Sequence, residues 1–266
     1  MGWFKRKAPK READDDGPTF APPSQEKVAY RALCLATIGL KGTIEHWITD
    51  QEETESGRQA KREHSQRLDA WARAEGLGRH FSPEEKRVLS IPIGKWPEQD
   101  LLDAHWRSEA FGVLAWSLSL IDRMPAWDRV IGVEFPEIHH VSGLLSPTKE
   151  FLWRVKLRPA TDLAKMQVRA KAWNWRARTT RLIRENHPLP PQITWDELLK
   201  VSSHGHYEEG DTPPPIRDDF PVLNKAYREL TDGEYQEILS IAQERHFAMN
   251  WLCGYSEDWD STPTGT

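Results

Sequence analysis

The sequence lacks most of the features by which enzymes and membrane proteins are recognised. It has only two cysteines in 266 residues, Cys34 and Cys253, and neither belongs to a CxxC motif. This excludes a disulfide framework and a cysteine-based zinc site, and it favours a reducing, cytoplasmic location. No stretch approaches the ~18 consecutive apolar residues that a transmembrane helix needs, and the opening residues lack the apolar region of a signal peptide.

Catalytic motifs of fixed spacing are missing as well. The chain has no P-loop, no glycine-rich dinucleotide-binding fingerprint, no GxSxG and no HExxH. These absences exclude only the enzymes that depend on such motifs, so enzymatic activity stays open, and no cofactor is indicated. The net charge of -5 gives no overall signature of a nucleic-acid-binding protein.

The first 23 residues differ in composition from the rest. They run basic, then acidic, then proline-rich, with little to bury, so residues 1–23 are predicted to be a disordered tail. Trp3 and Phe4 precede a short basic run, which permits weak contact of residues 1–7 with an anionic membrane surface. Because the basic run is so short, a plain disordered tail is the simpler expectation.

Helical patterns fill most of residues 24–266. Capping signals at Ser82, Thr194 and Thr231 predict helix starts, and the thirteen tryptophans predict aromatic packing between helices. We expect a single all-α globular domain, a bundle of roughly seven to nine helices without strands. Other boundary predictions are that glycines 39 and 42 end the first helix, that residues 51–66 are solvated or frayed, and that residues 203–221 form an irregular loop.

The helix predicted over residues 231–253 carries polar groups on its apolar face. Arg245 and His246 fall within the stripe, Asn250 lies at its edge, and Glu244 is predicted to point the opposite way. On one interpretation Arg245 ties two helices together and His246 is a core histidine with a hydrogen-bond partner. On the other, His246 and Asn250 line a pocket.

A second helix, predicted over residues 97–121, is apolar in nearly every direction from Trp106 onward, so it is expected to be buried all round. Glu109 lies within it, and an unpaired carboxylate there would be very costly. We therefore predict that Glu109 meets an arginine of another helix. Arg245 is the first choice, and Arg176 or Arg178 the second.

Two histidine clusters, His139-His140 and His204-Gly205-His206, fall in segments predicted to be loops. The acidic residues 208, 209 and 211 follow the second cluster. A metal site needs three or four ligands with supporting contacts. The clusters are interpreted as solvated histidines, and no metal site is predicted.

Charge is distributed unevenly along the chain. Residues 154–184 are strongly basic, whereas residues 229–266 are acidic, so the two segments either face each other or form separate solvated helix faces. Alternatively, the basic segment binds nucleic acid by phosphate contact and base stacking, or binds an acidic protein. The candidate strip of basic and aromatic side chains is Arg169, Trp173, Trp175, Arg176 and Arg178.

Five sequence blocks, in this order, resemble the bacterial domain-of-unknown-function family 4272. They are WRSEAFGVLAWSL (106–118), LRPA (157–160), WNWRARTTRL (173–182), DFPVLNKAYRELTDGEY (219–235) and ERHFAMNWLCGYSEDWD (244–260). The resemblance extends from about residue 25 to residue 266. Here the pair Trp259-Asp260 precedes STPTGT, without the final acidic residue of the family's tail. The resemblance implies a mostly helical cytoplasmic protein and brings no established reaction.

Two classes of function follow. The preferred hypothesis is a non-catalytic protein-interaction module, of partner-binding or immunity type, with an unknown protein partner. The alternative is an enzyme, a hydrolase or a nucleic-acid-processing activity, with Glu109 and His246 as acid and base and Arg245 and Asn250 as orienting groups. Solvent access to His246 and Asn250 distinguishes the two hypotheses.

Overall fold

The structure is a computed structural model that describes residues 17–50, 52–131 and 143–265. The regular secondary structure of this part of the chain is almost entirely helical, which confirms the predicted fold class. Its α-helices are α1 (Gln25–Thr49), α2 (Glu55–Ala74), α3 (Pro83–Leu89), α4 (Glu98–Ser117), α6 (Thr148–Arg154), α7 (Ala160–Arg184), α8 (Trp195–Glu208) and α9 (Asp232–Leu252). Two 3-10 turns (Leu77–Arg79 and Tyr227–Glu229) and one small hairpin of β1 (Pro221–Val222) and β2 (Lys225–Ala226) complete the described elements.

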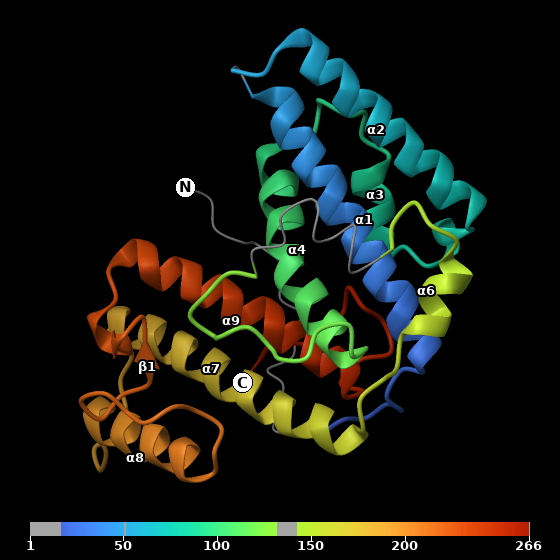
Figure 1. The fold of residues 1–266 in the computed structure, drawn as a ribbon. Coiled ribbons are helices and arrows are strands. Elements are labelled where there is room, and N and C mark those ends of the chain that lie inside the picture. Colours follow the sequence, from blue (N-terminus) through green and yellow to red (C-terminus); the bar gives the residue numbers. More distant parts are fainter. Residues whose placement is uncertain (1–16, 51, 132–142, 266) are drawn as a thin grey trace.

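Helix α9 lies at the centre of the molecule, packed against α4 on one side and α7 on the other (Figure 1). Helix α1 lies along α4, and α2 covers α1. Helix α8 and the hairpin lie at the far end of the molecule from α2 (Figure 1). The helices predicted around residues 98–121, 160–186 and 231–253 therefore form the centre, as expected.

The predicted helix starts are confirmed by their hydrogen bonds. Capping boxes join Ser82 to Glu85, Thr194 to Glu197 and Thr231 to Glu234. At the other end of α9, Gly254 has a φ of +84°, and the bond from the Tyr255 N–H to the Asn250 carbonyl completes a glycine-based cap. Local side-chain chemistry is enough to predict these ends.

The prediction that glycines 39 and 42 end the first helix is wrong, because α1 continues to Thr49. A Cβ added at Gly42 would lie 2.8 Å from the Cβ of Ala104 on α4. The glycine therefore serves the close approach of two helices rather than a helix end. This packing offsets the ~1 kcal/mol by which glycine disfavours a helix.

Of two further predictions, the solvated face over residues 51–66 is confirmed, and the loop over residues 203–221 is wrong in its first part. Most of the polar stretch 51–66 belongs to α2, which buries only Ser65, Leu68 and Ala72 and keeps its other faces half-buried or exposed. The predicted loop 203–221 is helical up to Glu208, so His204 and His206 stand on α8. His139 and His140 lie outside the described residues. The hairpin β1–β2 turns at Leu223 and Asn224, both with positive φ.

The helix predicted over residues 97–121 ends at Ser117, and only part of the stretch from Trp106 onward is buried as expected. Every residue from Glu109 to Leu118 is buried, and Trp116 and Leu114 join residues of α1 and α9 in the main core. Burial also raises the pKa of Cys34 to about 12 and that of Cys253 to about 11. Among the described residues, no helix has both the length and the apolar character needed to cross a membrane.

Residues 1–16 of the predicted tail, and with them the proposed membrane contact of residues 1–7, lie outside the described residues. The described part of the tail approaches the end of α9. The backbone N–H of Phe20 donates to the carbonyl of Gly254 at 3.0 Å. A Cβ at Gly254 would lie 2.2 Å from the Phe20 carbonyl oxygen, so this glycine is required both for its φ and for the contact.

We expect Gly42→Val to lower the free energy of unfolding by about 1–3 kcal/mol, because the added carbons must force α1 away from α4. The free energy is measured by urea titration. Gly205→Val on α8 is the matched control, because a Cβ there meets nothing within 4 Å. Equal stabilities of the two variants would contradict this account of the α1–α4 contact.

Candidate functional site

Glu109 and Arg245 form the buried ion pair that the sequence predicts. The Nε of Arg245 donates to Oε2 of Glu109 at 2.9 Å, and its Nη2 lies 2.9 Å from the same oxygen. Both side chains are fully buried, at 0% exposure. Desolvation raises the pKa of Glu109 and lowers that of Arg245, and the opposite charge of the partner counteracts each shift. The first choice of partner for Glu109 is confirmed.

The remaining donors of Arg245 bind the loop after α4. Its Nη1 donates to the carbonyls of Pro125 and Ala126 at 3.0 and 3.1 Å, and its Nη2 donates to the carbonyl of Arg129 at 2.8 Å. The other oxygen of Glu109 accepts from the N–H of Ile131 at 2.6 Å. All three guanidinium nitrogens thus donate hydrogen bonds. The pair holds this loop against α4 and α9.

His246 and Asn250 are buried one turn apart on α9, with exposures of 1% and 2%. The amide of Asn174 on α7 lies 3.1 Å from Nδ1 of His246, and Gln167 Nε2 donates to Oδ1 of Asn250 at 3.1 Å. Gln167 and Asn174 are two turns apart, so α7 and α9 meet through two matched polar contacts. The interpretation of His246 as a core histidine with a hydrogen-bond partner is the one its contacts fit.

The same two asparagines also hold a later part of the chain. We call residues 259–265 the return segment, because they run back over α7 and α9. Asn250 Nδ2 donates to the carbonyl of Pro263 at 2.9 Å, and Asn174 Nδ2 donates to the carbonyl of Thr264 at 3.2 Å. Trp259 is buried edge-on against Phe247 and Trp251 and anchors the start of the segment. The polar cluster of α7 and α9 is therefore covered by the chain itself.

Desolvation lowers the pKa of His246 to about 3, with further lowering by the charges of Lys171 and Arg178. The imidazole is thus neutral at physiological pH. Its Nδ1 accepts the Asn174 amide proton, and protonation there would set two donors against each other. A neutral, covered imidazole can act as a base only if the return segment moves away.

The candidate strip of basic and aromatic residues is not continuous on the surface. Trp173 is 2% exposed and stacks on Trp127, with ring centroids 6.2 Å apart. Arg176 is 0% exposed, whereas Trp175 and Arg178 are half-buried. The predicted base stacking on Trp173 and phosphate contact by Arg176 need exposed groups, and here both groups belong to the core.

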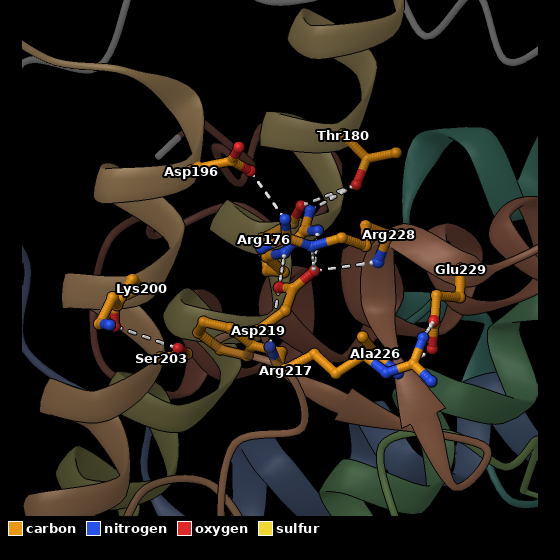
Figure 2. Close-up of polar contacts among 11 residues, drawn as sticks. Arg176, Thr180, Asp196, Lys200, Ser203, Arg217, Asp219, Ala226, Arg228 and Glu229 are labelled. Atoms are coloured by element: carbon orange, nitrogen blue, oxygen red, sulfur yellow. Dashed lines mark hydrogen bonds and ion pairs between the residues drawn. The ribbon is translucent and has the colours of Figure 1, made fainter.

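Arg176 instead forms a second buried ion pair (Figure 2). Its Nε and Nη2 donate to the two oxygens of Asp219 at 2.6 and 2.7 Å. Arg228 also donates to Asp219, through its backbone N–H at 3.0 Å, and reaches Asp196 at the start of α8. Burial raises the pKa of Asp219, but the hydrogen bonds and charge of Arg176 outweigh it and lower the pKa. This pair attaches the hairpin region and α8 to α7.

Sequence analysis did not find the partners Asn174, Gln167 and Asp219. Their signal was present, because Gln167 and Asn174 share a helix face with Ala170 and are polar where that face is apolar. The prediction that Glu244 points away from the core is wrong. It is 5% exposed and accepts from Arg107 of α4 at 3.0 Å, so α9 is buried on both sides.

Glu109→Gln leaves the guanidinium of Arg245 without a buried counter-charge, so we expect the free energy of unfolding to fall by about 3–5 kcal/mol. Urea titration followed by circular dichroism measures the loss. Glu237→Gln, at an exposed position on the same α9, should change stability by less than ~0.5 kcal/mol. Equal effects of the two substitutions would show that the ion pair contributes little.

His246 also predicts a pH dependence. Its pKa is about 3 in the folded chain, against an ordinary value of 6.5, so below pH 6.5 the unfolded chain takes up a proton that the folded chain does not. Stability from this group is complete above pH 6.5 and declines as the pH falls towards 3. From pH 7.5 to pH 5 the decline amounts to about 2 kcal/mol.

His246→Gln should remove this part of the pH dependence, which is measured as the difference between urea unfolding free energies at pH 7.5 and pH 5. His187→Gln, at an exposed position, should keep it. An unchanged difference in His246→Gln would mean that the imidazole is protonated in the folded chain.

Comparison with known proteins gives one family. The family described as domain of unknown function (DUF4272) matches residues 7–196, which is more than half of the chain. The match ends before the sequence blocks 219–235 and 244–260, so the resemblance covers less of the chain's later part than the blocks predict. No curated protein and no solved structure matches. The chain belongs to the DUF4272 family of domains of unknown function.

Proposed function

We propose that this chain is a non-catalytic protein-interaction module that recognises an extended segment of a partner protein through Asn174 and Asn250. The observation that supports this is the way the two side-chain amides hold the return segment. Each donates to a backbone carbonyl, and the two carbonyls belong to the successive residues Pro263 and Thr264. The same donors would bind the backbone of a partner segment when the return segment is released.

Amide donors of this kind recognise a backbone more than a sequence, because every residue carries a carbonyl. An extended segment with proline adds the advantage that its main chain has fewer N–H groups that need partners on burial. Recognition of extended segments by their main chain is a general mode of peptide binding. A partner segment rich in proline and threonine, like residues 261–265, fits these donors best.

The positions of the candidate acid and base groups favour this hypothesis over the enzymatic alternative. Glu109 is committed to Arg245 and Ile131, and His246 lies against Asn174 under the return segment. General acid–base catalysis needs such groups within about 3 Å of a substrate atom in an open cleft. We propose the cytoplasm as the location, because both cysteines are free thiols.

The test removes the part of the return segment that the asparagines hold and adds it back as a separate peptide. A chain truncated after Asp260 keeps the buried Trp259 and should bind a fluorescent peptide of residues 261–266, measured by anisotropy. The intact chain should bind the peptide far more weakly, because its own segment competes at high effective concentration.

In the truncated chain, Asn250→Ala should reduce peptide affinity by about tenfold, the equivalent of ~1.4 kcal/mol for one lost hydrogen bond. Gln192→Ala removes an exposed amide elsewhere and should have no effect. Equal peptide binding by intact and truncated chains, or no binding by a truncated chain that circular dichroism shows to be folded, would refute the proposed site.

A further inference from the structure

We propose that the carboxyl end of α8 is a binding site for a divalent transition-metal ion, with Zn²⁺ the best match, formed by His206, Glu209 and Asp211. One ligand atom of each lies within 4.8 Å of the other two. One imidazole nitrogen and two carboxylate oxygens form a donor set that suits Zn²⁺ and leaves a fourth position for water or a partner's side chain.

The spacing of the two half-buried ligands supports a tetrahedral site. His206 Nδ1 and Asp211 Oδ2 are 3.4 Å apart. Two ligands at ~2.0–2.1 Å from a zinc ion, separated by the tetrahedral angle, lie about 3.4 Å from each other. The separation of these two atoms, which contact each other directly in the structure, thus equals that expected for two ligands of one zinc ion. Glu209 is exposed, so its longer side chain can close on the ion by rotation.

The backbone after α8 turns sharply and brings Asp211 back to His206. Gly210 has a φ of +78°, which glycine adopts without strain. The N–H groups of Asp211 and Thr212 both donate to the carbonyl of His206, at 2.8 and 3.3 Å. This turn fixes the separation of the two ligands in the backbone itself.

Contacts around the ligands hold them in orientation. Arg169 on α7 donates to the carbonyl of Gly210 at 2.7 Å, and its Nε lies 3.7 Å from Oδ1 of Asp211. The other oxygen, Oδ2, is left facing His206. The ring of Phe220 packs edge-on against the imidazole, with centroids 5.9 Å apart. Supporting contacts of this kind are typical of metal ligands.

The charges around the proposed site both attract and repel a metal ion. Two carboxylates and the carboxyl end of a 14-residue helix favour a cation, whereas the charge of Arg169 opposes it. The net result is a site with two negative groups against one positive group.

The experiment uses the full chain without a histidine tag and titrates Zn²⁺ calorimetrically at pH 7.5. We expect one ion to bind, and we expect His206→Ala and Asp211→Asn each to weaken binding by at least about tenfold. His204→Ala is the matched control. It removes a histidine of the same helix that pairs instead with Asp218, at 2.8 Å, and should leave binding unchanged.

Zn²⁺ should also shift the nuclear magnetic resonance signals of the His206 ring and not those of the His204 ring, which gives a second, local measurement. Absence of Zn²⁺ binding by the folded chain would overturn the proposal. So would binding that keeps its full strength in His206→Ala, since the ion would then be held elsewhere.

Discussion

The fold depends on a charge pair enclosed in its centre. Glu109 of α4 and Arg245 of α9 lie 2.9 Å apart and fully buried, and a buried charge is tolerable only when paired and hydrogen-bonded. The terminal nitrogens of Arg245 also donate hydrogen bonds to three backbone carbonyls of the loop after α4. A single guanidinium thus sets the distance between two helices and the path of a loop. Small changes in that geometry would leave several polar groups without partners at once.

The contact between α7 and α9 also relies on buried polar side chains that bind each other, but here the groups are neutral. Asparagine, glutamine and histidine side chains meet where an apolar interface would be simpler, and the two asparagines also donate to the return segment. Such an interface has one register that satisfies its donors. It also explains why the proposed partner site is made of amides, because these groups already bind a backbone from outside the two helices.

Sequence reasoning predicted the features that depend on neighbours along the chain and one contact between distant residues, and it missed the other contacts between distant residues. The capping boxes at Ser82, Thr194 and Thr231 needed only a few residues, and the pair of Glu109 and Arg245 followed from the high cost of leaving either charge unpaired. The role of Gly42 was misread, because the residue that requires a glycine there, Ala104, lies on α4. The pairing of Arg176 with Asp219 was not predicted, because Asp219 lies in the segment 203–221 that was predicted to be an irregular loop. The position of His206 on α8 was missed as well, because that part of the helix was predicted to be a loop.

The family match and the fold do not end at the same place. The match stops at residue 196, whereas α9, which supplies Arg245, His246 and Asn250, starts at Asp232. A polypeptide cut at the edge of the match would retain Glu109 without its guanidinium and would expose the faces of α4 and α7 that α9 covers. The residues beyond the family match therefore supply the counter-charge of Glu109 and the packing partner of α4 and α7.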